Sequence, residues 1–291
     1  MIGLEGARPI DVDDLPQHSH WISYLLGLKP LPKSLDKSVE SIAREYGEDK
    51  WGNLIKSLRS LDAPTIFDAD ELCLDAKDIP CYADGEILLA DSFEVQAAYF
   101  ELIRSELKPL IEESGHLVEL GAGYGSIILK LATLPEFNRL SFTAAEFTDT
   151  GVDCIKLLTP DVQNGFETGF CDLNNLDLKM FSIPENAIYM TCWTMACLKG
   201  LSKKTLNEII LHKPSAVIHI EPIYEHWTED SLLQMLWKRY CQMNDYNRTL
   251  LTALKGYEAE GLIKIIEEKK NVFGSNPLAP VSIVKWAPCY D

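Results

Sequence analysis

Short apolar runs alternate with longer segments in which apolar residues recur every three or four positions from about residue 93 onward. The short runs are typical of buried strands, and the longer segments are typical of amphipathic helices. Seven runs are predicted to be strands: 116–120, 141–147, 164–170, 187–193, 216–223, 262–270 and 280–286. Helices are predicted between or before them, at 93–113, from 127, and at 152–158, 202–211 and 229–254. This alternation predicts an α/β protein with a doubly wound, Rossmann-like, seven-stranded sheet.

The first 92 residues show a different pattern. Prolines interrupt residues 1–35, so only one short helix is expected there, near residues 20–26. Residues 38–60 have helical spacing of apolar positions, and a mixed segment follows to about residue 91. We therefore expect a mostly helical N-terminal extension over 1–92 and a ligand-binding, catalytic domain over 93–291. The extension could close over a substrate or mediate formation of a homodimer.

The strand at 116–120 leads directly into a glycine-rich turn. Gly121, Gly123 and Gly125 occupy alternate positions, which lets the backbone bend sharply and approach a ligand. The spacing is GxGxG, whereas a dinucleotide site reads GxGxxG. With Glu119 before the turn and Glu146 at the end of the next strand, this region resembles motif I and the following acidic loop of class I S-adenosylmethionine-dependent methyltransferases.

The resemblance implies S-adenosyl-L-methionine as cofactor and S-adenosyl-L-homocysteine as product. In that family the glycine turn passes under the methionine moiety, and the acid after the second strand binds the ribose hydroxyls. Asp172, in GFCDLNN, is the candidate for the adenine amino group, although a turn or helix cap is an alternative. Trp193 could stack on a ligand or simply belong to the core. The implied cofactor-binding residues are Glu119, Gly121, Ala122, Gly123, Tyr124, Gly125, Glu146, Asp172, Leu173 and Trp193.

Substrate residues are expected where the fifth strand ends, in HIEPIYEHW. Glu221 is the leading candidate because a carboxylate at a strand end lies at the mouth of the cleft, and His219 points to the same face. Alternatively, Glu221 could be a structural helix cap, and His219 could be an ordinary core histidine. Glu221, His219 and Asp245 are the predicted catalytic residues. The predicted substrate-binding residues are Glu221, Tyr224, Asn247 and Asn276, the last of which could instead belong to a simple connection.

We expect methyl transfer to a nitrogen of a cationic amine or guanidine in amino-acid or natural-product metabolism. Carboxylates such as Glu221 and Asp245 would stabilise the positive charge that moves onto the acceptor. If a hydroxylated metabolite or sugar is methylated on oxygen instead, His219 or His226 would be the base. The segment 191–200 lacks the Asn/Asp-Pro-Pro-aromatic motif of methyltransferases that act on nucleic-acid amines or glutamine. It also lacks the paired glutamates of protein arginine methyltransferases. A non-catalytic nucleoside-binding module is the third interpretation.

The amino-acid composition limits the classes of substrate and partner that we expect. The net charge of −17, from 27 basic and 44 acidic residues, argues against DNA or RNA as substrate and favours a small molecule. The eight cysteines form no CxxC pair, and His18 and His20 have no further ligand at a suitable spacing, so no metal site is expected. The chain shows neither a signal-peptide pattern nor an apolar stretch that could span a bilayer. The prediction is a cytoplasmic protein without a membrane partner.

Overall fold

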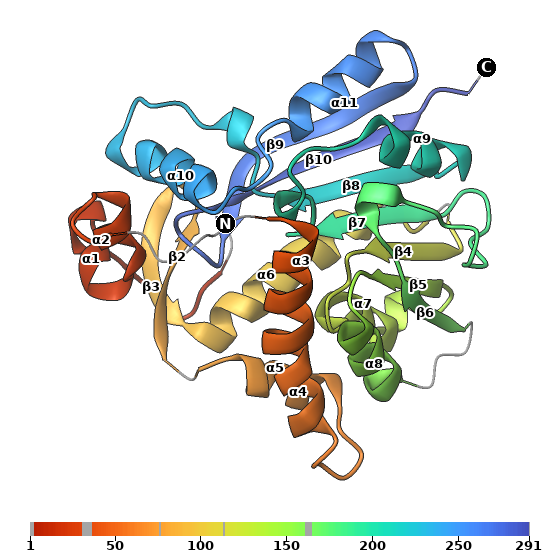
Figure 1. The fold of residues 1–291 in the computed structure, drawn as a ribbon, viewed down its shortest axis with the longest axis horizontal. Helices are drawn as coiled ribbons and strands as arrows, with labels where there is room; N and C mark the ends of the chain where they lie inside the picture. The colour runs from red at the N-terminus through yellow and green to blue at the C-terminus, as the bar shows by residue number, and fades with distance from the viewer. Residues whose placement is uncertain (1–2, 31–36, 76, 113, 161–164, 291) are drawn as a thin grey trace.

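One mixed sheet runs through the computed structural model, which describes residues 3–30, 37–75, 77–112, 114–160 and 165–290 (Figure 1). Within these residues the sheet has ten strands in the order β1-β3-β2-β9-β10-β8-β7-β4-β5-β6. The strands are β1 Arg8–Pro9, β2 Asp78–Ala83, β3 Glu86–Asp91, β4 His116–Leu120, β5 Ser141–Glu146, β6 Phe166–Phe170, β7 Ile188–Cys192, β8 Ala216–Glu221, β9 Ile263–Gly274 and β10 Val281–Pro288.

The seven predicted strands are all present and form the larger part of this sheet. β6, β5, β4, β7 and β8 are parallel, and β10 runs antiparallel between β8 and β9. The chain starts this unit at β4 and adds strands first on one side and then on the other, so the order reverses beside β4. This arrangement confirms the predicted doubly wound, Rossmann-like sheet. A ligand crevice is expected at the carboxyl ends of the strands where the order reverses.

Helices cover both faces of the parallel strands, as the alternation of apolar positions requires. α6 Ser92–Leu107, α7 Ser126–Thr133 and α8 Asp149–Leu158 pack on one face, where Leu117 of β4 is buried. α9 Lys203–Leu211 and α11 Leu250–Ala259 pack on the other face, against Val118. No helix in the described parts of the chain combines the length and apolar character needed to cross a membrane.

The N-terminal region contains more strand than the sequence pattern indicated. Besides helices, it supplies β1 and the β2–β3 hairpin, so the sheet has ten strands in the described part of the chain instead of the seven predicted. The hairpin joins the sheet where Tyr82 pairs with Gly274 and Ala83 pairs with Phe273. The helical elements are α1 Leu15–His18, α2 Trp21–Leu25, α3 Val39–Ile42, the π-helix η2 Ala43–Lys50, α4 Trp51–Leu58 and α5 Ile66–Cys73.

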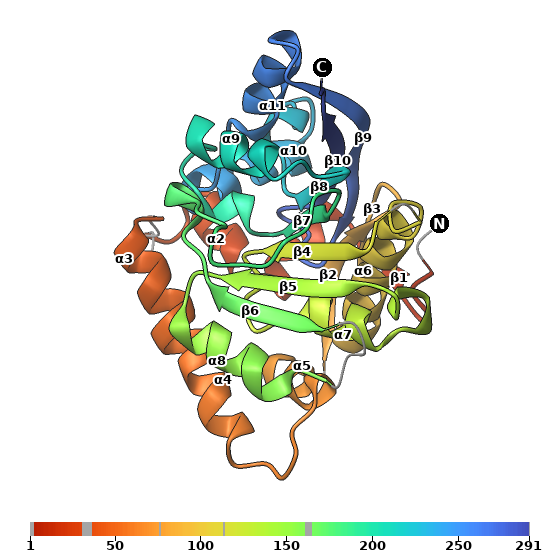
Figure 2. The same cartoon turned by 90° about the vertical axis from the view of Figure 1, so that its right-hand side faces the viewer.

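The single long helix predicted over 229–254 is wrong, because the chain forms two helices there. α10 Leu232–Met243 ends at Asn244, and α11 begins at Leu250. Asp245 has a left-handed backbone with φ of 51°, and the Asn244 side chain donates to the Tyr240 carbonyl instead of supporting another turn. Short polar side chains compete with helical backbone bonds in this way. α3, η2 and α4 follow one another directly and form a rod at the carboxyl ends of β4 and β5 (Figure 2).

Candidate functional site

A cavity of about 320 Å³ opens at the carboxyl ends of β4, β5 and β7, beside the point where the strand order reverses. Its volume lies in the range of small-molecule pockets, about 300–1,000 Å³. The walls come from four regions of the chain. They are the turn between β4 and α7, the segments after β5, β6 and β7, the rod formed by α3, η2 and α4, and one side of α6.

The glycine turn adopts the sharp geometry that its sequence predicts. Gly121, Gly123 and Gly125 have φ of 74°, 60° and 88°, a left-handed region that side chains with a Cβ rarely occupy. A Cβ at Gly121 would lie 2.2 Å from Cγ2 of Thr194. One at Gly123 would lie 3.2 Å from the ring of Trp51. Glycine therefore allows both the turn and the close approach of its neighbours.

Two buried glutamates flank this turn. Glu146 Oε2 accepts from the Gly123 N–H at 2.9 Å, and Oε1 accepts from the N–H and hydroxyl of Thr148. Glu119 Oε2 accepts from the Ile128 N–H at 3.2 Å. Burial raises the pKa of Glu119 to about 8 and also raises the pKa of Glu146. Both carboxyl groups line the cavity and can accept hydrogen bonds there when ionised.

The segment after β6 lines the same cavity. Asp172 accepts from the Asn174 N–H at 2.8 Å and from the Asn175 side chain at 3.2 Å, so it caps the short helix η4 Leu173–Asn175. Asp172 and Leu173 both lie in the cavity lining. Asp172 can therefore cap η4 and still face a ligand, so the two alternatives suggested by the sequence are compatible.

Trp193 lies in the lining with an unusual backbone. It follows β7 directly and has φ of 55°, and its N–H donates to the Ile220 carbonyl at 3.2 Å. A bulky residue in this conformation costs on the order of 1–3 kcal/mol and is concentrated at functional sites. Of the ten predicted cofactor residues, all but Gly125 lie in the lining; Gly125 instead forms the N-cap of α7.

Glu221, predicted to bind the substrate, lies outside the cavity lining. Its side chain is fully buried, and its two oxygens accept from the backbone N–H groups of Thr194, Met195 and Ala196 at 2.9–3.2 Å. It therefore fixes the short helix η5 Met195–Cys197 after β7. Burial raises its pKa to about 7. The geometry gives this carboxylate a structural role in place of the substrate contact that the sequence suggested.

His219 is likewise a core residue. Trp286 Nε1 donates to His219 Nε2 at 3.0 Å, and Nδ1 lies 2.9 Å from the Thr191 hydroxyl. Burial lowers its pKa to about 4, so the ring is neutral near pH 7. It does not line the cavity, and both ring nitrogens are engaged. His226, the alternative base, contacts Ser282 and Glu268 on β10 and β9.

The remaining predicted catalytic residue, Asp245, and the remaining predicted substrate-binding residues are held outside the cavity lining as well. Asp245 pairs with Lys199 at 3.3 Å and accepts from the Lys37 N–H at 3.5 Å. Asn247 Oδ1 accepts from the Thr249 N–H at 2.9 Å. The remaining two bond within the C-terminal region: Tyr224 accepts from Gln242, and Asn276 donates to Tyr240. The structure does not bring these four together at one place facing the cavity.

The N-terminal extension supplies one wall of the cavity, through residues that the sequence pattern did not single out. Val39, Ile42 and Tyr46 line the cavity from α3 and η2, and Trp51 does so from α4. Their spacing of three, four and five residues was visible, but it indicated only a helix packed on a core. Tyr99 and Gln96 of α6 also line the cavity. A π-helix at this position accords with the frequent occurrence of such turns at functional sites.

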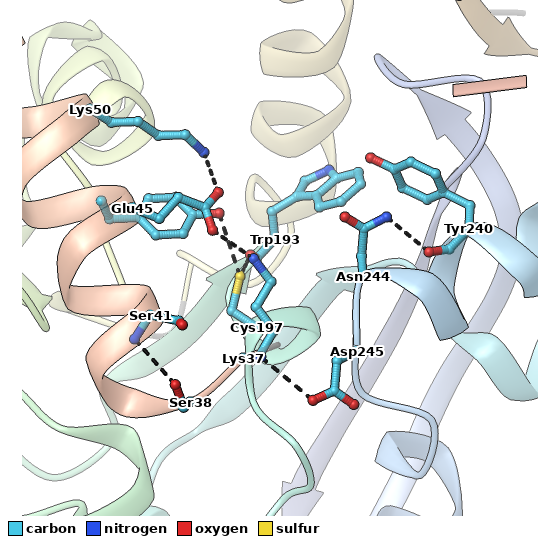
Figure 3. Close-up of polar contacts among 11 residues, drawn as sticks. Lys37, Ser38, Ser41, Glu45, Lys50, Trp193, Cys197, Tyr240, Asn244 and Asp245 are labelled. Atoms are coloured by element: carbon cyan, nitrogen blue, oxygen red, sulfur yellow. Dashed lines mark hydrogen bonds and ion pairs between the residues drawn. The ribbon is translucent and has the colours of Figure 1, made fainter. Parts of the chain in front are cut away.

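A polar network holds this wall in place (Figure 3). Lys37 Nζ lies 2.8 Å from Glu45, which also pairs with Lys50 at 2.9 Å. The Lys37 ammonium is buried 5.8 and 5.5 Å from the ring centres of Tyr46 and Tyr246. The Tyr46 hydroxyl is hydrogen-bonded to the Cys197 thiol at 3.6 Å. These contacts join the rod to η5 and to the segment after α10. In the described residues, no group of three or more His, Cys, Asp or Glu side chains is arranged to hold a metal ion.

Comparison with known proteins gives matches only among solved structures. No family model matches the chain, and no curated protein matches it. An O-methyltransferase of neocarzinostatin biosynthesis, crystallised with S-adenosyl-L-homocysteine and 1,4-dihydroxy-2-naphthoic acid, shares 16% identity over 67% of this chain, with a TM-score of 0.42. This chain spans 58% of that protein.

Two further matches have similar values. The pyocyanin biosynthetic protein PhzM shares 15% identity over 92% of this chain and 76% of its own, with a TM-score of 0.45. The small RNA methyltransferase HEN1 shares 14% identity over 68% of this chain and 26% of its own, with a TM-score of 0.45. At these identities and scores, the assignment of a function depends on the cavity itself.

Proposed function

We propose that this protein is an S-adenosyl-L-methionine-dependent methyltransferase acting on a small molecule. The observation that carries the proposal is that one cavity brings together the left-handed glycine turn, Glu146 after β5 and the Asp172–Leu173 segment after β6. These three elements border the crevice where a doubly wound sheet binds nucleotides. The net charge of −17 favours a small acceptor over a nucleic acid.

Each wall of the cavity suits one part of the cofactor. The glycine turn allows close approach of the backbone, and Glu146 supplies carboxylate oxygens that can accept from the ribose hydroxyls. Asp172 and Leu173 line the same cavity and would border the base. When bound, the cofactor would supply a methyl group carried on a positively charged sulfur. The chain has to align the acceptor and exclude water.

The described lining of the cavity includes none of the side chains predicted to serve either acceptor. Glu221 and Asp245, the carboxylates proposed for a cationic acceptor, are engaged elsewhere, and so are His219 and His226, the bases proposed for a hydroxyl. The choice between oxygen and nitrogen therefore depends on the character of the wall. The wall contributed by α3, η2, η5 and Trp193 is mainly apolar and aromatic. Such a surface suits a compact, apolar, hydroxylated acceptor, and we place O-methylation of such a metabolite first. A cationic amine held on the aromatic faces is the alternative.

Calorimetric titration with S-adenosyl-L-methionine, S-adenosyl-L-homocysteine and NADH tests the cofactor assignment. We expect both sulfur nucleosides to bind and NADH not to bind. Glu146→Gln keeps the side-chain size but removes the charged acceptor, which should weaken binding about 10- to 100-fold. Glu86→Gln, at an exposed position on β3, is the matched control and should leave binding unchanged. Absence of binding to either sulfur nucleoside would refute the proposal.

Methyl transfer to small phenols, aliphatic alcohols, amines and guanidines, followed by mass spectrometry, tests the acceptor class. Methyl ether formation supports the assignment to oxygen. Formation of N-methyl products with no ether would shift it to nitrogen. Tight cofactor binding with no transfer to any of these classes would favour a nucleoside-binding module.

A further inference from the structure

A second hollow lies beside the cavity, between α5, α6 and the end of α7. Its volume of about 280 Å³ is close to the lower end of the range of small-molecule pockets, about 300–1,000 Å³. Three aromatic side chains line it, Phe67 of α5 and Phe93 and Phe100 of α6. Phe67 and Phe93 remain 62% and 38% exposed. Exposed apolar side chains that border a hollow are typical of a binding site.

Three charged side chains also line this hollow: Asp70 and Glu71 of α5 and Lys130 of α7. Lys130 Nζ pairs with Asp70 Oδ2 at 2.8 Å, and both side chains are largely buried, so the charges of this pair balance each other. Glu71 is exposed and forms no ion pair with the residues that the structure describes. The hollow therefore carries one unbalanced negative charge at its exposed rim.

Phenyl rings combined with an unpaired carboxylate suit an organic cation. An ammonium group is attracted both to the face of an aromatic ring and to a carboxylate. The Lys130 ammonium already makes a contact of the first kind, since it lies 4.9 Å from the ring centre of Phe100. Glu71 would repel an anion. We propose that the hollow binds a small organic cation, with its ammonium group at Glu71 and its apolar body against Phe67 and Phe93.

The hollow and the cavity depend on the same side chains. Asp70 lines the hollow, and its Oδ1 accepts hydrogen bonds from Tyr124 and Ser126, which line the cavity. Gln96 of α6 lies in both linings. A ligand that fills the hollow contacts α5, α6 and α7 together, and it therefore holds Asp70 in place beside the glycine turn.

This link makes the hollow a regulatory site. A cation bound there should strengthen binding of the sulfur nucleoside in the cavity, because the turn is then held in its binding conformation. By linkage, the nucleoside should strengthen binding of the cation by the same factor. The coupling rests on the function proposed above, whereas binding of the cation does not.

Calorimetric titration with three probes that share a phenethyl body separates charge from apolar contact. The probes are phenethylammonium, phenethyl alcohol and phenylpropionate. We expect the cation to bind at least about fivefold more tightly than the alcohol, and the acid to bind most weakly. Glu71→Gln should reduce the affinity for the cation to that for the alcohol. Glu86→Gln, at an exposed position on β3, is the matched control and should leave it unchanged.

A variant that fills the hollow locates the bound cation. Ala97 of α6 lines the hollow and is exposed, so Ala97→Leu adds volume there without disturbing the core. It should weaken binding of the cation by at least about tenfold. Ala259→Leu, at the exposed end of α11, is the matched control and should have no effect. Saturating cation should raise the affinity for S-adenosyl-L-homocysteine at least about threefold in the unaltered protein, and not in Ala97→Leu.

The outcomes distinguish this inference from the proposed function. If no probe binds, or if the acid binds as tightly as the cation, the cation site is overturned. It is also overturned if Ala97→Leu, shown to be folded by cooperative urea unfolding, binds the cation as tightly as the unaltered protein, because the cation then lies elsewhere. If the cation binds in the hollow but S-adenosyl-L-homocysteine does not bind at all, the proposed function fails and the cation site stands. If both bind without affecting each other, the regulatory coupling is overturned.

Discussion

At the scale of single residues, neighbouring carboxyl groups at the strand ends differ in what surrounds them. Glu221 is met by three backbone N–H groups and is used to hold η5. Glu119 accepts one N–H and borders the cavity. Both are buried, so water does not stabilise their charge, and the pKa of each is raised, to about 7 for Glu221 and about 8 for Glu119. Glu221 therefore has a structural role away from the cavity lining, whereas Glu119 remains open to a ligand.

The raised pKa of Glu119 predicts a specific dependence of stability on pH. Between its unfolded value of about 4.5 and its folded value of about 8, the folded protein keeps a proton that the unfolded chain has lost. The free energy of unfolding should therefore fall with rising pH by at most about 1.4 kcal/mol per unit from this group, and the fall should stop above pH 8. Glu221 adds a similar fall that ends near pH 7.

Urea unfolding of Glu119→Gln between pH 5 and 9 checks this expectation. The variant should lose most of the decline between pH 7 and 8, where Glu119 is the titrating member of the pair. Glu86→Gln, at an exposed site, should keep the profile of the unaltered protein. An identical slope in Glu119→Gln and the unaltered protein would show that the folded carboxyl group titrates near its ordinary value.

At the scale of elements, the glycine turn and the segment after β7 depend on each other. Gly121 has φ of 74° and leaves no room for a Cβ beside Thr194. We expect Gly121→Ala to lower the free energy of unfolding by about 2–4 kcal/mol, from the left-handed backbone and the steric overlap together. It should also weaken S-adenosyl-L-homocysteine binding. Gly115→Ala is the matched control, because nothing lies within 4 Å of a Cβ there. Equal stability of the two variants, measured by urea unfolding, would contradict the steric explanation.

Elements defined by local pattern were predictable, and those defined by contacts between distant segments were not. The seven strands and the glycine turn follow from apolar runs and glycine spacing within short windows. The β2–β3 hairpin carried a local signal too: Asp84 and Gly85 have φ of 51° and 92°, as the turn of a tight hairpin requires, and lie between apolar stretches. A hairpin therefore lies in the segment for which only a mixed pattern is predicted.

The cofactor half of the site was more predictable than the acceptor half for the same reason. Glu119, Gly121 and Gly123 are consecutive or nearly so, and one motif locates them together. The direction of the Glu221 side chain depends on N–H groups of residues 194–196, about 25 positions earlier in the chain. Its position at a strand end was correctly predicted, but the strand pattern holds no information about which groups approach from β7. The same holds for Trp51, whose role depends on how a separate helix packs.

At the scale of the whole molecule, the N-terminal extension is built into the domain that follows it. The β2–β3 hairpin continues the sheet from β9, and Leu54, Leu58 and Ile66 of the extension belong to the core on the α6–α8 face. Asp70 of α5 bonds to Tyr124 and Ser126, and its other oxygen pairs with Lys130 of α7 at 2.8 Å. The extension therefore supports the turn that borders the cavity as well as one wall of the cavity.

We predict that residues 93–291 produced alone lose both cooperative unfolding and binding of S-adenosyl-L-homocysteine. The truncation would expose the apolar face that the extension covers, leave the β9 edge unpaired, and remove Trp51 and Asp70 from beside the glycine turn. Asp70→Asn in the full chain tests the last contribution separately: it should weaken binding while urea unfolding stays cooperative, because the sheet and the core remain. A fragment 93–291 that unfolds cooperatively and binds with the affinity of the full chain would show that the cavity is complete without the extension. In that case the two parts predicted from the sequence would be independent domains. The wall that the extension supplies would then not be needed for cofactor binding.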